Sequence, residues 1–235
     1  MIKRTAIAIL LLLTTTPLFC APVFQEVYFT YAGNFKGRLL IPDKPGKLPV
    51  IIYNYDQYLD WTGEKQARVQ GYDINRTMQY LANQGFIVFI PIERFRKMNA
   101  IKGAIQYIAS HPKTDRSQIH LIGLSEGGFL SLQAAKEIPY IKTVSVVTPR
   151  PLGDTGYFSL PGMLRELGQI RIPIMYIVGT DERTWTQERA RILAIAIYQH
   201  HLNMTYREYP YGKKWFWSEQ HQFMTDIITF IRQHM

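Results

Sequence analysis

The sequence holds one serine in a pattern that could make it a nucleophile, Gly123-Leu124-Ser125-Glu126-Gly127. A short apolar run over residues 119–123 predicts a strand before this serine, and residues 127–137 predict a helix after it. A tight strand-to-helix turn projects the serine hydroxyl, and it requires glycines because larger side chains would collide with the helix and the next strand. The start of the helix would also direct backbone N–H groups at a developing oxyanion. We therefore expect Ser125 to attack a carbonyl group.

A serine nucleophile of this kind works with an acid and a base. Asp181 lies just past the strand predicted at residues 174–178, and functional side chains of parallel sheets gather at the carboxyl ends of the strands. We assign it as the acid, although an aspartate here could also cap the helix that begins soon after. Two other carboxylates stay open as alternatives, Glu182 beside it and Asp154 after the preceding predicted strand.

The sequence contains six histidines as candidates for the base. His221 comes after the last predicted strand, residues 204–209, and opens the last predicted helix, residues 222–234. The others lie at the ends of predicted elements or near the C-terminus, where a lone histidine is usually solvated or structural; they are His111, His120, His200, His201 and His234. No H-E-x-x-H motif and no phosphate-binding glycine loop is present, so we expect neither a metal nor a cofactor.

Strands and helices alternate along most of the chain. Strands are predicted at residues 24–30, 35–41, 50–55, 86–90, 119–123, 143–147, 174–178 and 204–209, with the first two antiparallel. Helices are predicted at residues 73–84, 99–109, 127–137, 186–200 and 222–234. This alternation predicts one α/β domain over residues 21–235, a mostly parallel sheet with helices on both faces. Residues 150–171, broken by prolines and glycines, predict only a small excursion over one edge of the sheet.

The serine turn and its context resemble the nucleophile turn of the α/β-hydrolase superfamily, and the resemblance covers nearly all of residues 24–235. It implies an eight-stranded sheet with a minimal cap and a triad of Ser125, Asp181 and His221, in the order this fold uses. The run HPKTDRSQIHLIGLSEGG, residues 111–128, resembles dienelactone hydrolases and prolyl-oligopeptidase-like esterases. Dienelactone hydrolases use a cysteine nucleophile, so the resemblance implies acyl hydrolysis and not their lactone substrate.

The oxyanion donors differ in how far the sequence defines them. The backbone N–H of Glu126, directly after the nucleophile, is expected to be one donor. The second is expected from the loop at PVIIYNYDQY, residues 49–58, near Tyr55 or Asp56. The superfamily commonly has His-Gly in this loop, so the departure leaves the second donor open.

Three aromatic residues, Trp215, Phe216 and Trp217, come just before His221. They could pack against the last helix, or they could form a pocket wall for an apolar or aromatic acyl group. The sequence favours neither interpretation over the other.

The N-terminus indicates export. Lys3 and Arg4 precede a short apolar run, too short to span a bilayer, which predicts a signal peptide over residues 1–20 with cleavage near Cys20-Ala21. Lipid modification of Cys20 is less favoured because Phe19 precedes it, and an uncleaved anchor is the other alternative. The expected product is a periplasmic or secreted protein with no disulfide and no stable membrane insertion.

The function predicted from these features is hydrolysis of a carboxylic ester through an acyl-enzyme. A peptidase or thioesterase with the same triad is one alternative, and a catalytically weak hydrolase-fold binding protein is another. The formal net charge is +9, but the basic residues are scattered, so we expect a small-molecule ester partner and no nucleic acid. The oligomeric state stays open.

Overall fold

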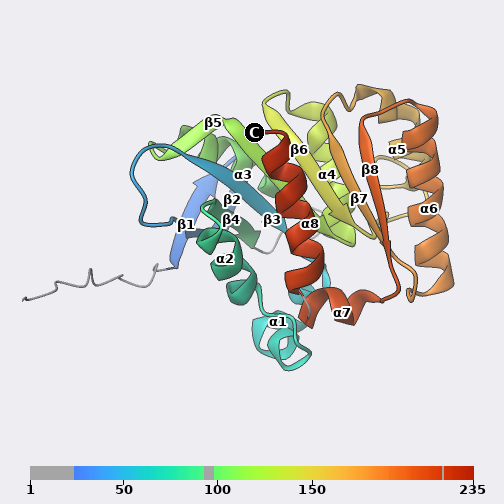
Figure 1. Ribbon diagram of the computed structural model, residues 1–235, viewed down its shortest axis with the longest axis horizontal. Coiled ribbons are helices and arrows are strands. Elements are labelled where there is room, and N and C mark those ends of the chain that lie inside the picture. The colour runs from blue at the N-terminus through green and yellow to red at the C-terminus, as the bar shows by residue number, and fades with distance from the viewer. Residues whose placement is uncertain (1–23, 93–97, 219) are drawn as a thin grey trace, which may run out of the picture.

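The computed structural model describes residues 24–92, 98–218 and 220–235, apart from the side chains of residues 220 and 221. Its centre is an eight-stranded sheet in the order β1-β2-β4-β3-β5-β6-β7-β8 (Figure 1). β1 pairs antiparallel with β2 and β2 with β4, whereas the remaining neighbours are parallel. The strands are β1 Gln25–Thr30, β2 Asn34–Leu40, β3 Leu48–Asn54, β4 Ile87–Ile92, β5 Thr114–Leu124, β6 Ile141–Val147, β7 Ile174–Gly179 and β8 Met204–Tyr209. The predicted mostly parallel, eight-stranded sheet is confirmed.

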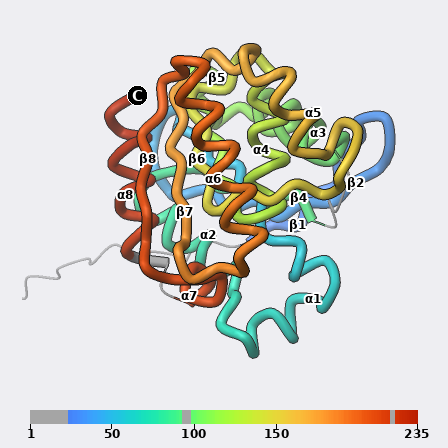
Figure 2. Tube along the Cα trace, turned by 90° about the vertical axis from the view of Figure 1, so that its right-hand side faces the viewer, coloured from blue at the N-terminus to red at the C-terminus, as the bar shows by residue number. Residues whose placement is uncertain are grey.

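Helices cover both faces of this sheet. Figure 2 shows α3, α4, α5 and α6 on one side and α2 and α8 on the other. α1 and α7 lie near one end of the sheet (Figure 1). The helices are α1 Tyr58–Val69, α2 Ile74–Asn83, α3 Met98–Ser110, α4 Glu126–Glu137, α5 Leu160–Glu166, the 3-10 turn η1 Leu167–Gln169, α6 Thr184–Gln199, α7 Lys213–Ser218 and α8 Gln220–Gln233.

The alternation of side chains along β3 divides the interior into two cores. Val50 and Ile52 pack into the core beneath α3, α4 and α6, whereas Ile51 and Tyr53 pack into the core beneath α2 and α8. Successive side chains of a strand point to opposite faces, so a strand covered on both sides is apolar throughout. The continuous apolar run at residues 50–53 therefore reflects the burial of β3 on both faces.

Residues 150–171 differ from the excursion predicted for them. They form α5 and η1, and Met163 and Leu167 are fully buried in the same core as Leu193 of α6. The hydroxyl of Ser159 caps α5 by accepting a hydrogen bond from the Gly162 N–H at 3.0 Å. The segment therefore extends the helical layer on one face instead of covering an edge of the sheet.

Two short helices at the carboxyl end of the sheet were not predicted, α1 and α7. In α1 only Leu59 and Ala67 are buried, and Gly63 interrupts the helix with φ 77°. The sequence of α1 therefore lacks the regular spacing of apolar residues that predicts a helix. α7 is a single short segment of six residues. None of the helices in the described part of the chain is long and apolar enough to cross a membrane.

Candidate active site

Ser125 occupies a strained turn between β5 and α4. Its backbone has φ 52° and ψ −117°, a region that residues other than glycine rarely adopt. The Ser125 N–H donates to the carbonyl of Val147 at 2.8 Å, and its own carbonyl accepts from the Arg150 N–H at 2.9 Å. Main-chain hydrogen bonds to the end of β6 therefore hold the serine in place.

The two flanking glycines are required by close contacts between main chains. A Cβ on Gly123 would lie 2.3 Å from the carbonyl oxygen of Gly127, and a Cβ on Gly127 would lie 2.1 Å from that of Asn54. Both distances are far below van der Waals contact. The steric reason that the sequence suggested for Gly-x-Ser-x-Gly is therefore present, and it involves β3 as well as α4.

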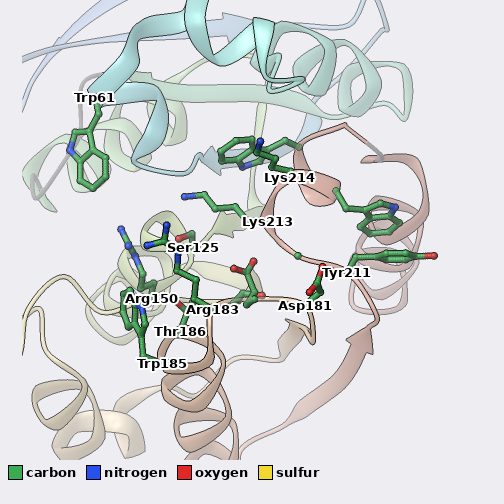
Figure 3. Close-up of a pocket in the computed structure, with 15 residues that line it drawn as sticks. Trp61, Ser125, Arg150, Asp181, Arg183, Trp185, Thr186, Tyr211, Lys213 and Lys214 are labelled. Carbon is green, nitrogen blue, oxygen red and sulfur yellow. The ribbon is translucent and has the colours of Figure 1, made fainter.

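Ser125 lies in a cavity of about 590 Å³ at the carboxyl ends of the parallel strands. Other lining residues follow β6 and β7, and Trp61 of α1 and residues 211–215 contribute as well. Figure 3 shows Lys213 extending across the cavity toward the side on which Ser125 and Arg150 lie. Among the side chains that the structure describes, no three His, Cys, Asp or Glu residues are grouped to hold a metal ion.

The three candidate acids have different positions. Asp181 and Glu182 both line the cavity of Ser125. The Asp181 side chain is exposed and its backbone N–H donates to the carbonyl of Tyr211 at 3.3 Å. Asp154 lines an adjoining cavity instead, where it is 83% exposed and pairs with Arg189 at 2.8 Å.

Glu182 is the less exposed of the two carboxylates in the cavity. It also lines a small recess beside Ser125. Burial raises the pKa of the Glu182 carboxyl to about 7; the Lys213 cation opposes this rise and the Asp56 carboxylate adds to it. Glu182 therefore stays open as an alternative acid, and Asp181 stays a prediction.

The loop after β3 places Asp56 below the cavity, fully buried. Its backbone N–H donates to the Tyr72 hydroxyl at 2.9 Å, so this predicted oxyanion donor already has a partner in the structure. Its carboxylate forms an ion pair with Lys213 at 2.9 Å and accepts a hydrogen bond from the Tyr58 N–H at 2.8 Å.

Tyr55, the other predicted donor, is fully buried and its hydroxyl donates a hydrogen bond to Asp60 at 2.6 Å. Helix α4 begins at Glu126, the residue whose backbone N–H is predicted to be the first oxyanion donor.

The aromatic residues before α8 both pack and line the cavity. Trp215 and Trp217 line it, and Trp217 stacks on Tyr58 and Tyr72 with ring centroids 4.8 and 5.1 Å away. Phe216 is buried against Phe223 of α8, with centroids 5.2 Å apart. Packing and cavity lining therefore occur together in this segment, since Trp215 also contacts the Phe223 ring with centroids 6.2 Å apart.

The predicted base, His221, lies at the start of α8, and its side chain is outside the described part of the structure. The predicted signal peptide, residues 1–20, is also outside the described residues. The roles assigned to them stay predictions.

Sequence reasoning missed the Asp56–Lys213 pair and Arg150. Asp56 was predicted only as a backbone oxyanion donor, and Arg150 follows the carboxyl end of β6, which is a signal that could have identified it. Lys213 carries no such signal, because only the folding of α7 over the loop after β3 brings it to Asp56.

No family model matches the chain. It is 28% identical to human acyl-coenzyme A thioesterase 1 over 153 residues, which are 61% of this chain and 32% of that protein. A Klebsiella pneumoniae protein assigned as a dienelactone hydrolase superimposes with a TM-score of 0.74 at 14% identity, covering 91% of this chain and all of the other. Pyrococcus horikoshii acylaminoacyl peptidase superimposes with a TM-score of 0.71 at 12% identity. The superposition covers 92% of this chain and 42% of the peptidase chain.

These solved structures are described as hydrolases and superimpose on most of this chain, and they support the resemblance that the serine turn indicated. At such low identity the likeness concerns the fold. The chain is a protein of the α/β-hydrolase fold, with Ser125 in the turn between β5 and α4.

Proposed function

We propose that the chain is a serine hydrolase that cleaves carboxylic esters through an acyl-enzyme. The observation that carries the proposal is the strained backbone of Ser125, with φ 52°, held between two glycines at the surface of a cavity of about 590 Å³. Strain of this kind persists only where the surrounding structure enforces it, and it is typical of functional sites.

In the proposed reaction, the Ser125 hydroxyl oxygen attacks the acyl carbonyl while His221 takes its proton. The Glu126 N–H at the start of α4 donates to the oxyanion. His221 then protonates the leaving alcohol, and the acyl group stays on Ser125. Water, deprotonated by His221, then attacks the acyl carbonyl; the acid leaves and His221 returns the proton to the Ser125 oxygen, while Asp181 holds the imidazole in the required tautomer.

Labelling with a neutral fluorophosphonate probe tests the nucleophile. We expect labelling of the wild type, none of Ser125→Ala, and a loss of turnover on the order of 10⁴ to 10⁶ in that variant. Ser110→Ala is the matched control, because Ser110 is exposed on α3 and bonds only to the carbonyl of Tyr107. Labelling that survives Ser125→Ala would place the nucleophile elsewhere.

A thioesterase is the second candidate, and the partial match to human acyl-coenzyme A thioesterase 1 favours it. Oxygen esters and thioesters share the same acyl-enzyme, so the fold accommodates both. Matched p-nitrophenyl esters and N-acetylcysteamine thioesters of several acyl lengths separate them. A kcat/KM at least about tenfold higher for the thioesters would reverse the order of the two candidates.

We also propose that residues 1–20 are a signal peptide. The basic Lys3 and Arg4 and the short apolar run after them support export. Mass spectrometry of the extracytoplasmic protein should find a chain that starts near Ala21 without lipid. A diacylated Cys20 would instead place the protein on a membrane surface.

A further inference from the structure

The cavity around Ser125 is lined by more cations than anions. Arg150, Arg183, Lys213 and Lys214 line it, against Asp181 and Glu182. The Lys213 ammonium is neutralised by the buried Asp56 carboxylate at 2.9 Å. Arg183 and Lys214 are exposed, so water screens their charges. Arg150 is the cation whose environment needs an explanation.

Arg150 is partly buried, and its charge opposes the rise in the pKa of the Glu182 carboxyl, which lines the same cavity. Within the described residues Arg150 forms no ion pair or side-chain hydrogen bond, and its Nε is buried without a partner. Its guanidinium lies over the Trp185 ring, 5.7 Å from the centroid. Its backbone N–H donates to the carbonyl of Ser125 at 2.9 Å, which fixes its distance from the nucleophile.

Arg189 provides an internal comparison on the same ring. Its guanidinium also lies over Trp185, at 5.5 Å, but it is paired with Asp154 at 2.8 Å. It lines the adjoining cavity of about 260 Å³ and not the one that contains Ser125. Of the two arginines on Trp185, Arg150 is the one that forms no ion pair or side-chain hydrogen bond within the described residues.

We propose that Arg150, supported by Trp185 and by the nearby Arg183, is a binding site for an anionic group of the substrate, a carboxylate or a phosphate. The inference rests on the proposed hydrolase function and names the substrate class of that site. A guanidinium presents parallel N–H donors that match either anion, and a partly buried donor without a partner is costly until a ligand supplies one. Trp185 orients the planar group from below.

The sources of the anion differ in position along the substrate. A carboxylate at the far end of the acyl chain would come from a half-ester of a dicarboxylic acid. A phosphate in the leaving group would come from a phosphorylated thiol or alcohol. Because Arg150 also lines the adjoining cavity, there is room for either arrangement.

Two matched substrate pairs test the proposal. The first is p-nitrophenyl butyrate and mono-p-nitrophenyl succinate, and the second is the butyryl thioester of N-acetylcysteamine and that of phosphopantetheine. We expect the ratio of kcat/KM, charged over neutral, to exceed about tenfold in at least one pair. Arg150→Gln should lower this ratio about tenfold to a hundredfold, and Arg189→Gln should leave it within about twofold. The preferred pair identifies the source of the anion.

A ratio near one in both pairs, or a ratio that Arg150→Gln does not change, would overturn the anion site. Failure of the proposed function would look different, with no turnover of any substrate and no fluorophosphonate labelling of Ser125. In that event calorimetry with monomethyl succinate and with phosphopantetheine decides the binding site alone. Wild-type binding that Arg150→Gln weakens about tenfold or more supports it, and equal or absent binding in the two proteins rejects it.

Discussion

The two sides of the cavity are held by different kinds of contact. The nucleophile turn, residues 123–128, is held by main-chain hydrogen bonds and by glycines in contact with neighbouring main chain. The charged side, which we define as Asp56, Asp181, Glu182 and Lys213, contains one buried ion pair and a carboxyl group, that of Glu182, whose pKa responds to the charges around it. The difference teaches that the first side cannot accept an added atom, whereas the second responds to the charge of its groups.

The largest expected effect comes from removing the charge of Asp181, the proposed catalytic acid. Asp181→Asn should keep the fold and lower turnover by roughly 10⁴, because in the proposed triad the His221 imidazole would lose the carboxylate that selects its tautomer. Glu182→Gln and Asp154→Asn should each cost less than about tenfold, measured as kcat with the best ester. If Glu182→Gln is the damaging change, the acid is the more buried carboxylate beside Ser125.

A methyl group added to the turn around Ser125, residues 123–128, tests how rigid this turn is. Gly127→Ala places a Cβ 2.1 Å from the Asn54 carbonyl oxygen, so either β3 or α4 must move. We expect a loss of about 3 kcal/mol or more in the free energy of unfolding, followed in urea. Gly153→Ala is the control, because its Cβ would meet its nearest neighbour at 3.8 Å. Equal stability of the two variants would show that the turn is adaptable.

Breaking the buried ion pair tests the charged side. Lys213→Met leaves the Asp56 carboxylate, whose side chain is 1% exposed, without its cation. We expect a loss of about 3 kcal/mol, at the low end for buried pairs because Lys213 is itself partly exposed. Adding Asp56→Asn should restore most of it, since no buried charge is then left unpaired. A single variant as stable as the wild type would contradict the importance of the pair.

The smallest effect concerns the pH dependence of stability. The pKa of Glu182 rises from 4.5 to about 7 on folding, so between these values the folded protein binds more protons than the unfolded chain. Stability should therefore fall as pH rises through this window. Glu182→Gln should remove this contribution, measured as the difference in Tm between wild type and variant at each pH. Parallel curves for the two proteins would show that Glu182 titrates normally.

Local pattern was enough to predict much of this fold. The continuous apolar runs of the inner strands predict burial on both faces, and the alternation of strands with helices predicts a mostly parallel sheet. The limits of the longer helices are close to the predicted ones, as for α2, which begins after the capping residue Asp73. α1 and α5 were missed because they bury few residues each and carry little periodicity.

The sequence by itself determined the strand, the serine and the two glycines, because a main-chain clash depends only on the local turn and its nearest strand. It also determined that Asp181 follows a strand end. Only the tertiary structure decided that Asp56 pairs with Lys213, that Glu182 is more buried than Asp181, and that Arg150 lies over Trp185. These properties depend on how α6, α7 and the strand ends approach one another. Burial and charge pairing are set by neighbours far along the chain, which no local pattern records.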